Sequence, residues 1–317
     1  MRDFTDLTPS SNIRTGVAVS SGGAHGIAFL AALRSLNQSG HLKNLHAMSG
    51  ASAGAVISAI IGSSVNEGLL KDGHRGNISH YIEEGARKTN VIFRQAAVLG
   101  QLVRHPGGKF LKPFFEAYAE IMPDHINQWH LQKLPPHLNQ NAVAEGPIDV
   151  LIGTTIYEKN GQARPVTISN LVTPEVIAAS CALNRPIKIE DQWHSDGGFT
   201  KAAPVRDLIL ESGCNHIIMI GETSRVPQAA RHQTQAMIND GSPHATRHFE
   251  GHAKLLQEEF PGVTIEYVGI PAPDCDISRG TLSKEHFDAL DELGTKVGQL
   301  HQSKLGASIP DHALIHA

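Results

Sequence analysis

Apolar and polar residues follow one another along the first sixty positions in patterns that predict strands, each followed by a helix. Residues 15–20 form a short apolar run typical of a buried strand, and residues 27–36 are apolar over a helical length. The same order returns as a strand pattern at 45–48 and a helix pattern at 53–61. This βαβα alternation predicts a parallel sheet covered by helices. We therefore expect a three-layer α/β/α fold around a central, mainly parallel sheet.

The rest of the chain repeats these patterns, with one exception. Residues 75–145 show helical patterns interrupted by prolines and no strong strand, which predicts an inserted helical cap. Beyond it we expect strands at 148–156, 165–169, 193–199, 216–221 and 263–268, and helices at 174–183, 205–212, 228–260 (with a break near 240–243) and 284–305. The prediction is a single domain over 1–317, with its motifs in 14–221 and a C-terminal extension over 222–317.

The composition is that of an ordinary globular protein. Hydrophobic residues make up 40% of the 317 residues and the net charge is −4, which gives no indication of nucleic-acid binding. Cys181, Cys214 and Cys275 are far apart and predict neither a disulfide framework nor a C-x-x-C metal pair. The N-terminus lacks the apolar core of a secretory peptide, and no apolar run reaches the roughly 18 residues of a membrane span. We expect a soluble cytoplasmic protein.

A G-x-S-x-G pentapeptide, Gly50 to Gly54, lies between the second strand pattern and the second helix pattern. A serine at such a junction, here Ser52, has its hydroxyl exposed near the backbone N–H groups at the helix start. The glycines Gly50 and Gly54 suit a tight turn with close backbone approach. The pentapeptide alone is weak evidence, and the alternative is a turn serine without chemistry.

A glycine-rich loop, Ser21 to Gly26, follows the first strand and opens the first helix. Its successive N–H groups suit a phosphate, or the oxyanion that forms when a serine attacks an ester. The dinucleotide interpretation lacks the G-x-G-x-x-G spacing and an acid after the second strand, and a Walker A loop would need Gly-Lys-Ser/Thr. An oxyanion hole beside Ser52 is the favoured interpretation.

Asp196, followed by Gly197 and Gly198, ends a predicted strand. A serine nucleophile needs a base, usually a histidine held by an acid. None of the 19 histidines lies in an obvious late post-strand loop with a matching acid upstream. Asp196 is therefore the candidate base, and the alternative is a simple hairpin turn.

Together these segments resemble the patatin-like phospholipase family, whose members carry a glycine-rich oxyanion loop, a G-x-S-x-G turn and an Asp-Gly-Gly or Asp-Gly-Ala motif in that order. The likeness covers roughly 14–221 and includes Ala178 to Ala182 and Ala203 to Val205. It implies a patatin-like fold and hydrolysis of phospholipid or lysophospholipid esters, with no metal or cofactor. Ser52 would be the nucleophile and Asp196 its sole general base, a dyad without histidine. The resemblance also assigns oxyanion-hole amides to Gly22, Gly23 and Ala24, and supporting motif positions to His25, Gly26, Gly50, Gly54, Gly197 and Gly198.

Two loop positions depart from the family pattern, which usually reads Gly-Gly-Gly-x-Arg/Lys-Gly. Ser21 replaces the first glycine and His25 replaces the basic residue. A histidine keeps a donor but carries its full charge only below about pH 6.5, so the departure concerns the loop's positive charge. The alternative for His25 is a helix cap or an exposed side chain without a role. Asn184 stands where the family tends to have proline, which we interpret as a loop variation.

Two further groups of residues allow either a binding role or a purely structural role. His244, His248 and His252 are spaced four apart on a predicted helix and could hold Zn²⁺, but a polar helix face is favoured. Residues 87–112 carry six basic side chains and no acid among apolar residues, which could contact an anionic membrane peripherally. The slightly favoured alternative is an amphipathic cap helix packed on the core, and the two are compatible.

Two classes of function follow. The first is a lipid acyl hydrolase of the phospholipase A or lysophospholipase type. The second is a non-hydrolytic or inactive protein of the same fold that binds an anionic ligand at 21–26. A conventional Ser-His-Asp esterase is a third possibility, which would depend on a histidine and tolerate Asp196→Asn.

Overall fold

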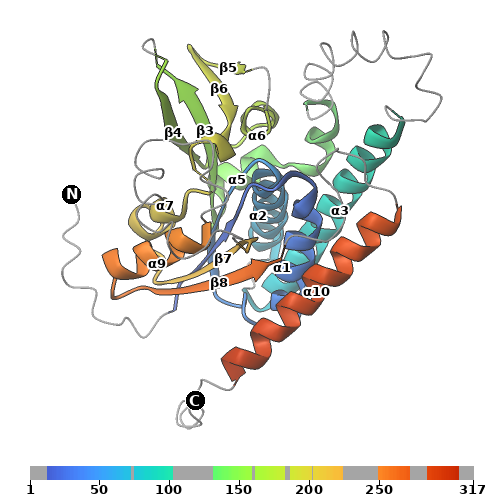
Figure 1. The fold of residues 1–317 in the computed structure, drawn as a ribbon, viewed down its shortest axis with the longest axis vertical. Helices are drawn as coiled ribbons and strands as arrows, with labels where there is room; N and C mark the ends of the chain where they lie inside the picture. The colour runs from blue at the N-terminus through green and yellow to red at the C-terminus, as the bar shows by residue number, and fades with distance from the viewer. Residues whose placement is uncertain are drawn as a thin grey trace.

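The computed structural model describes residues 13–72, 75–102, 131–158, 161–182, 186–201, 203–223, 249–271 and 284–306 (Figure 1). Their core is one eight-stranded sheet of order β5-β6-β3-β2-β1-β7-β8, with β4 also paired to β3. Pairing is parallel from β3 through β2, β1 and β7 to β8, and antiparallel among β3, β4, β6 and β5. The strands are β1 Thr15–Val19, β2 Leu45–Ala51, β3 Asp149–Tyr157, β4 Ala163–Ser169, β5 Ile187–Ile189, β6 Gln192–Asp196, β7 His216–Glu222 and β8 Thr264–Ile270. The sheet is thus mixed and mostly parallel, as expected, and the short β5 is the strand that the apolar patterns missed.

Helices cover both faces of this sheet. In Figure 1, α1, α2, α3 and α10 lie on one side of β7 and β8, and α7 and α9 lie on the other. The helices are α1 Gly26–Gln38, α2 Ala53–Asp72, α3 Ile78–Leu102, α5 Gln140–Glu145, α6 Pro174–Ser180, α7 Val205–Leu210, α9 Phe249–Glu259 and α10 Lys284–Gly306. The three-layer prediction is confirmed.

The period-two alternation of the central strands explains why both faces are covered. Along β1, Val17 and Val19 join the apolar cluster on the α1 side, whereas Ala18 between them joins the cluster on the α9 side. Along β7, Ile218 and Ile220 face the first cluster, and Ile217 and Met219 face the second. A strand buried on both faces needs apolar residues at every position, which is why these strands read as unbroken apolar runs.

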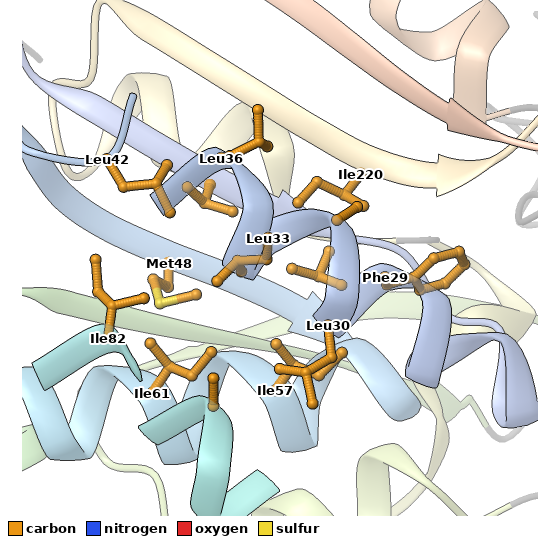
Figure 2. Packing of buried hydrophobic residues seen from close by; sticks show 14 of the residues in the cluster. Phe29, Leu30, Leu33, Leu36, Leu42, Met48, Ile57, Ile61, Ile82 and Ile220 are labelled. Carbon is orange, nitrogen blue, oxygen red and sulfur yellow. The ribbon is translucent and has the colours of Figure 1, made fainter. Parts of the chain in front are cut away.

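The larger apolar cluster is shown in Figure 2. Side chains of α1, among them Leu30 and Leu33, lie between Ile220 of β7 and Ile57 and Ile61 of α2. α2 is long and apolar enough to cross a membrane, but 89% of its most apolar window is buried inside the protein. Its hydropathy therefore reflects its position as a core helix.

The expected helical cap over 75–145 is not confirmed. α3 carries Ile78, Ile82 and Ala86 into the same cluster as α1 and α2, so its first half is part of the helical layer. Helical periodicity predicts a helix but not the surface on which it packs. Residues 103–130 lie outside the described part of the chain.

The described part of the basic segment 87–112 contacts the protein itself. Lys88 lies 3.0 Å from Glu84, and the Arg94 guanidinium lies 4.5 Å from the centroid of the Phe287 ring of α10. These contacts favour the packed helix over a membrane surface for this part. The basic residues from 104 onward lie outside the described residues.

Candidate active site

Strand β3 pairs with the two strands, β2 and β6, whose ends carry Ser52 and Asp196. β2 pairs with the first half of β3, ending at Ala51 opposite Gly153, and β6 pairs with the second half, ending at Asp196 opposite Thr154. β4 pairs with both halves, so β2 and β6 share the other edge of β3. Ser52 follows Ala51 directly, and therefore the two segments meet end to end beside neighbouring residues of β3.

The turn that carries Ser52 is strained and tightly packed. Ser52 has a left-handed φ of 54°, which costs a non-glycine residue about 1–3 kcal/mol. A Cβ on Gly50 would lie 2.1 Å from the carbonyl oxygen of Gly54, and one on Gly54 would lie 2.0 Å from that of Val19. Only glycine fits at these two positions, and α2 begins directly after the serine. The structure thus has the strand–turn–helix junction that the pentapeptide predicts.

Ser180 fixes the backbone of this turn from α6. The Ser52 N–H donates to Ser180 Oγ at 2.9 Å, and the Ser180 hydroxyl donates to the carbonyl oxygen of Gly153 at 2.6 Å. Ser180 is fully buried, so the bridge is shielded from water. The small-residue segment Ala178 to Ala182 pointed to this helix, but nothing in the sequence singled out Ser180.

Asp196 is a buried carboxylate with few donors. It is 2% exposed, and its Oδ1 accepts one hydrogen bond, from the Gly198 N–H at 2.7 Å. Burial raises its pKa from the usual 3.8 to about 6, against the opposing effects of hydrogen bonds from Ser52 and Gly198. Its Oδ2 has no partner of good hydrogen-bond geometry within the described residues. Catalytic hydrogen bonds are commonly long before substrate binds.

The Asp-Gly-Gly turn also contacts the glycine-rich loop. A Cβ on Gly197 would lie 2.1 Å from the carbonyl oxygen of Gly153, so this turn sits directly against β3. A Cβ on Gly198 would lie 2.6 Å from Ser21 Oγ. The structure therefore brings all three predicted segments together, around Ser21, Ser52 and Asp196.

The loop itself forms a short 3-10 turn, Gly23–His25, that leads into α1. Gly23 has a φ of +51°, which glycine adopts without strain. Residues 22–24 thus precede the N-terminus of a helix, where N–H groups lack intrahelical partners and favour negative charge. His25 Nδ1 lies 3.3 Å from Glu222 Oε2 at the end of β7, a partner that the sequence did not reveal.

The described histidines do not complete a triad. His194 lies two residues before Asp196, but its Nδ1 hydrogen-bonds Thr154 Oγ1 at 2.9 Å. No histidine contacts Ser52 or Asp196 among the residues that the structure describes. The Ser-His-Asp alternative finds no support there.

Metal binding finds no support in the described part of the chain either. No group of three His, Cys, Asp or Glu side chains suited to a metal occurs in it. His252 packs beside Phe249, and burial lowers its pKa to about 4. His244 and His248 lie outside the described residues, so the three-histidine face is not tested.

Two hollows on the described surface lie elsewhere. One is lined by residues that include Glu67, Lys88 and His137, and the other by residues that include Arg34 and Arg87. Neither is lined by Ser52 or Asp196. The candidate site is therefore identified from its chemistry and from the strand register.

Comparison with known proteins gives one family and several structures. A family model, patatin-like phospholipase, matches residues 17–209. The chain is similar to VipD from Legionella pneumophila, with 15% identity and a TM-score of 0.43 over 92% of this chain and 67% of that one. It is also similar to the type III effector protein ExoU, with 15% identity and a TM-score of 0.37 over 92% of this chain and 53% of that one. It is similar as well to ExoU in its complex with SpcU from Pseudomonas aeruginosa, with 17% identity and a TM-score of 0.35 over 92% of this chain and 52% of that one. The chain thus spans about half the length of ExoU, and no curated protein matches it significantly.

Proposed function

The chain belongs to the patatin-like phospholipase family, and from that premise we propose that it is a lipid acyl hydrolase with a Ser52–Asp196 dyad. Its substrates would be fatty-acyl esters of phospholipids or lysophospholipids. The observation that carries the proposal is the meeting of β2 and β6 on one edge of β3, which sets the serine turn beside a buried carboxylate. Free Cys181 and Cys214 agree with a reducing compartment, and we propose the cytoplasm.

The raised pKa of Asp196 suits it to act as the base. A carboxylate with a pKa of about 6 is ionised in about nine molecules of ten at pH 7, yet binds a proton far more tightly than an ordinary aspartate. A catalytic pKa near the working pH combines the correct protonation state with useful basicity. Asp196 thus takes the Ser52 proton as Oγ attacks the ester carbonyl.

The remaining steps use the same two side chains and the loop. The tetrahedral oxyanion accepts hydrogen bonds from N–H groups of Gly22, Gly23 and Ala24, and each good donor contributes roughly 3–4 kcal/mol. Protonated Asp196 then gives its proton to the departing alcohol oxygen, which leaves an acyl-serine. Asp196 next removes a proton from water, which attacks the acyl-serine and releases the fatty acid, and Ser52 recovers its proton.

A fluorophosphonate probe, together with fatty-acid release, tests this proposal. We expect the probe to label Ser52, and a panel of phospholipids, lysophospholipids and acylglycerols to yield free fatty acid. Fatty-acid release should disappear in Ser52→Ala and in Asp196→Asn, whereas probe labelling should disappear in Ser52→Ala and become slow in Asp196→Asn. The matched control is Asp191→Asn, because the Asp191 side chain is fully exposed and lies five positions away.

The other outcomes point to the alternatives. A folded wild-type protein that neither reacts with the probe nor releases fatty acid would favour the non-hydrolytic anion-binding protein. Full activity of Asp196→Asn, combined with loss of activity in a single histidine variant, would instead favour a Ser-His-Asp esterase.

A further inference from the structure

The glycine-rich loop is held at both ends by the same strand. At its start, the Ser20 N–H donates to the carbonyl oxygen of Ile220 at 2.9 Å. At its end, His25 Nδ1 lies 3.3 Å from Glu222 Oε2. Ile220 and Glu222 are alternate residues of β7, so one rigid strand fixes the span of the loop. Movement of either end would move the N–H groups between them.

Glu222 is itself well anchored. It pairs with Ile270 of β8 at the end of the sheet, and the Tyr267 hydroxyl donates to its carbonyl oxygen at 2.5 Å. The side chains of His25 and Glu222 are 20% and 34% exposed. The ion pair is therefore screened less than one in open solvent, while both groups remain accessible to protons.

We infer that Glu222 is a positioning residue that acts through His25 to hold the loop amides of 22–24. The effect on the loop stands on the contacts alone, whereas its effect on turnover rests on the proposed function. A neutral imidazole still donates one hydrogen bond from Nδ1–H, but a charged imidazolium adds the attraction to the carboxylate.

Among the described residues, Glu222 is the charged group that contacts His25 at the end of the loop. At the start of the loop, Ser21 lies against Gly198, whose N–H donates to Asp196. Ala53 of α2 and Phe93 of α3 are the side chains nearest to the following Gly26.

Hydrogen exchange of the loop, followed by mass spectrometry, tests the inference without relying on activity. We expect Glu222→Gln to speed exchange of peptides covering residues 20–26 by about threefold to tenfold, corrected for intrinsic rates. Turnover should fall by a similar factor in kcat, with KM nearly unchanged. The matched control is Glu259→Gln, which removes the partly exposed carboxylate of a similar pair with Arg206 and should leave the loop unchanged.

Each outcome decides the matter. Identical loop exchange in wild type and Glu222→Gln overturns the inference, as does an equal speeding of loop exchange in the Glu259→Gln control. If Glu222→Gln fails to fold, His25→Gln tests the same contact from the other side. Failure of the proposed function would appear separately, as a wild-type protein without fatty-acid release, and the exchange result would still decide whether the pair holds the loop.

Discussion

Two shielded carboxylates among the described residues have opposite properties, and one lies at the candidate active site and the other between β8 and α10. Asp196 is 2% exposed and has a pKa of about 6. The Glu266 side chain is 15% exposed and has a pKa of about 2. Both are largely removed from water, so burial alone does not explain why one holds its proton more tightly than usual and the other less.

The difference lies in the donors that each carboxylate meets. Burial by itself would raise the pKa of Glu266, but His216 Nε2 at 2.8 Å from Oε1 and His301 Nε2 at 3.1 Å from Oε2 outweigh it. Asp196 has one backbone donor on Oδ1, and Oδ2 lacks a good one among the described residues. Glu266 joins β7, β8 and α10 with both oxygens satisfied, whereas Asp196 keeps the proton affinity that a base requires.

The largest expected effect is a loss of activity when either residue of the candidate dyad is replaced. Ser52→Ala and Asp196→Asn should each lower kcat for fatty-acid release by at least about 10³-fold, because nucleophile and base act as one unit. The kcat of the double variant should be about the same as that of the less active single variant. Additive losses, measured in the same assay, would contradict a shared step.

The same Asp196→Asn variant should gain stability while it loses activity. Because the folded pKa of Asp196 lies above its usual value, its favourable contribution is complete below about pH 3.8 and is lost as the pH rises through about 6. A neutral amide removes the buried charge, so the free energy of unfolding at pH 8 should rise by about 1–3 kcal/mol. Urea unfolding at pH 8 measures this, and a clear loss of stability would show that the charge is satisfied in the folded state.

Glu266→Gln should give the reverse result, with lower stability and preserved activity. Because the pKa of Glu266 in the folded protein lies below its usual value, the ionised side chain stabilises the fold above about pH 4.5. This contribution is lost as the pH falls toward about 2. Allowing for partial exposure, we expect a loss of about 1–2 kcal/mol at pH 7. The control is Glu292→Gln, which removes an exposed carboxylate from α10 and should leave stability unchanged. Equal free energies of unfolding for wild type and Glu266→Gln from about pH 4.5 to pH 7 would show that the two histidines do not stabilise the ionised carboxylate.

Ser180→Ala separates the positioning of Ser52 from the proton affinity of Asp196, and should lower activity far less than loss of either dyad residue. It removes the bridge between the Ser52 N–H and the Gly153 carbonyl without touching Asp196. We expect kcat to fall by about tenfold, or roughly 1.4 kcal/mol, while the acid midpoint of the pH profile stays near 6. A shifted midpoint would mean that Ser180 acts on the base and not on the turn.

The sequence predicted the features that depend on neighbouring residues. Apolar periodicity predicted the alternating strands and helices, and the glycines at 50 and 54 predicted the tight turn, because both follow from local geometry. Asp196 could be chosen as the candidate base because its two glycines mark a turn at a strand end, and the structure places it at the end of β6. The short β5 lacked enough residues to form a pattern.

Features that depend on strand pairing could not be predicted in this way. The His25–Glu222 contact joins residues nearly two hundred positions apart through the pairing of β1 with β7. Ser180 reaches Ser52 only because α6 packs behind β3. The cap prediction failed to anticipate α3 in the core layer, because an amphipathic pattern does not specify which surface covers its apolar face.

The rate at which a fluorophosphonate labels Ser52, followed against pH, tests most directly whether the high proton affinity of Asp196 activates the serine. On the acid side, wild type should show a rise in labelling rate with a midpoint near pH 6, and Asp196→Asn should show a slow, flat profile. A midpoint near pH 4 in wild type, or the same rise in Asp196→Asn, would contradict the account.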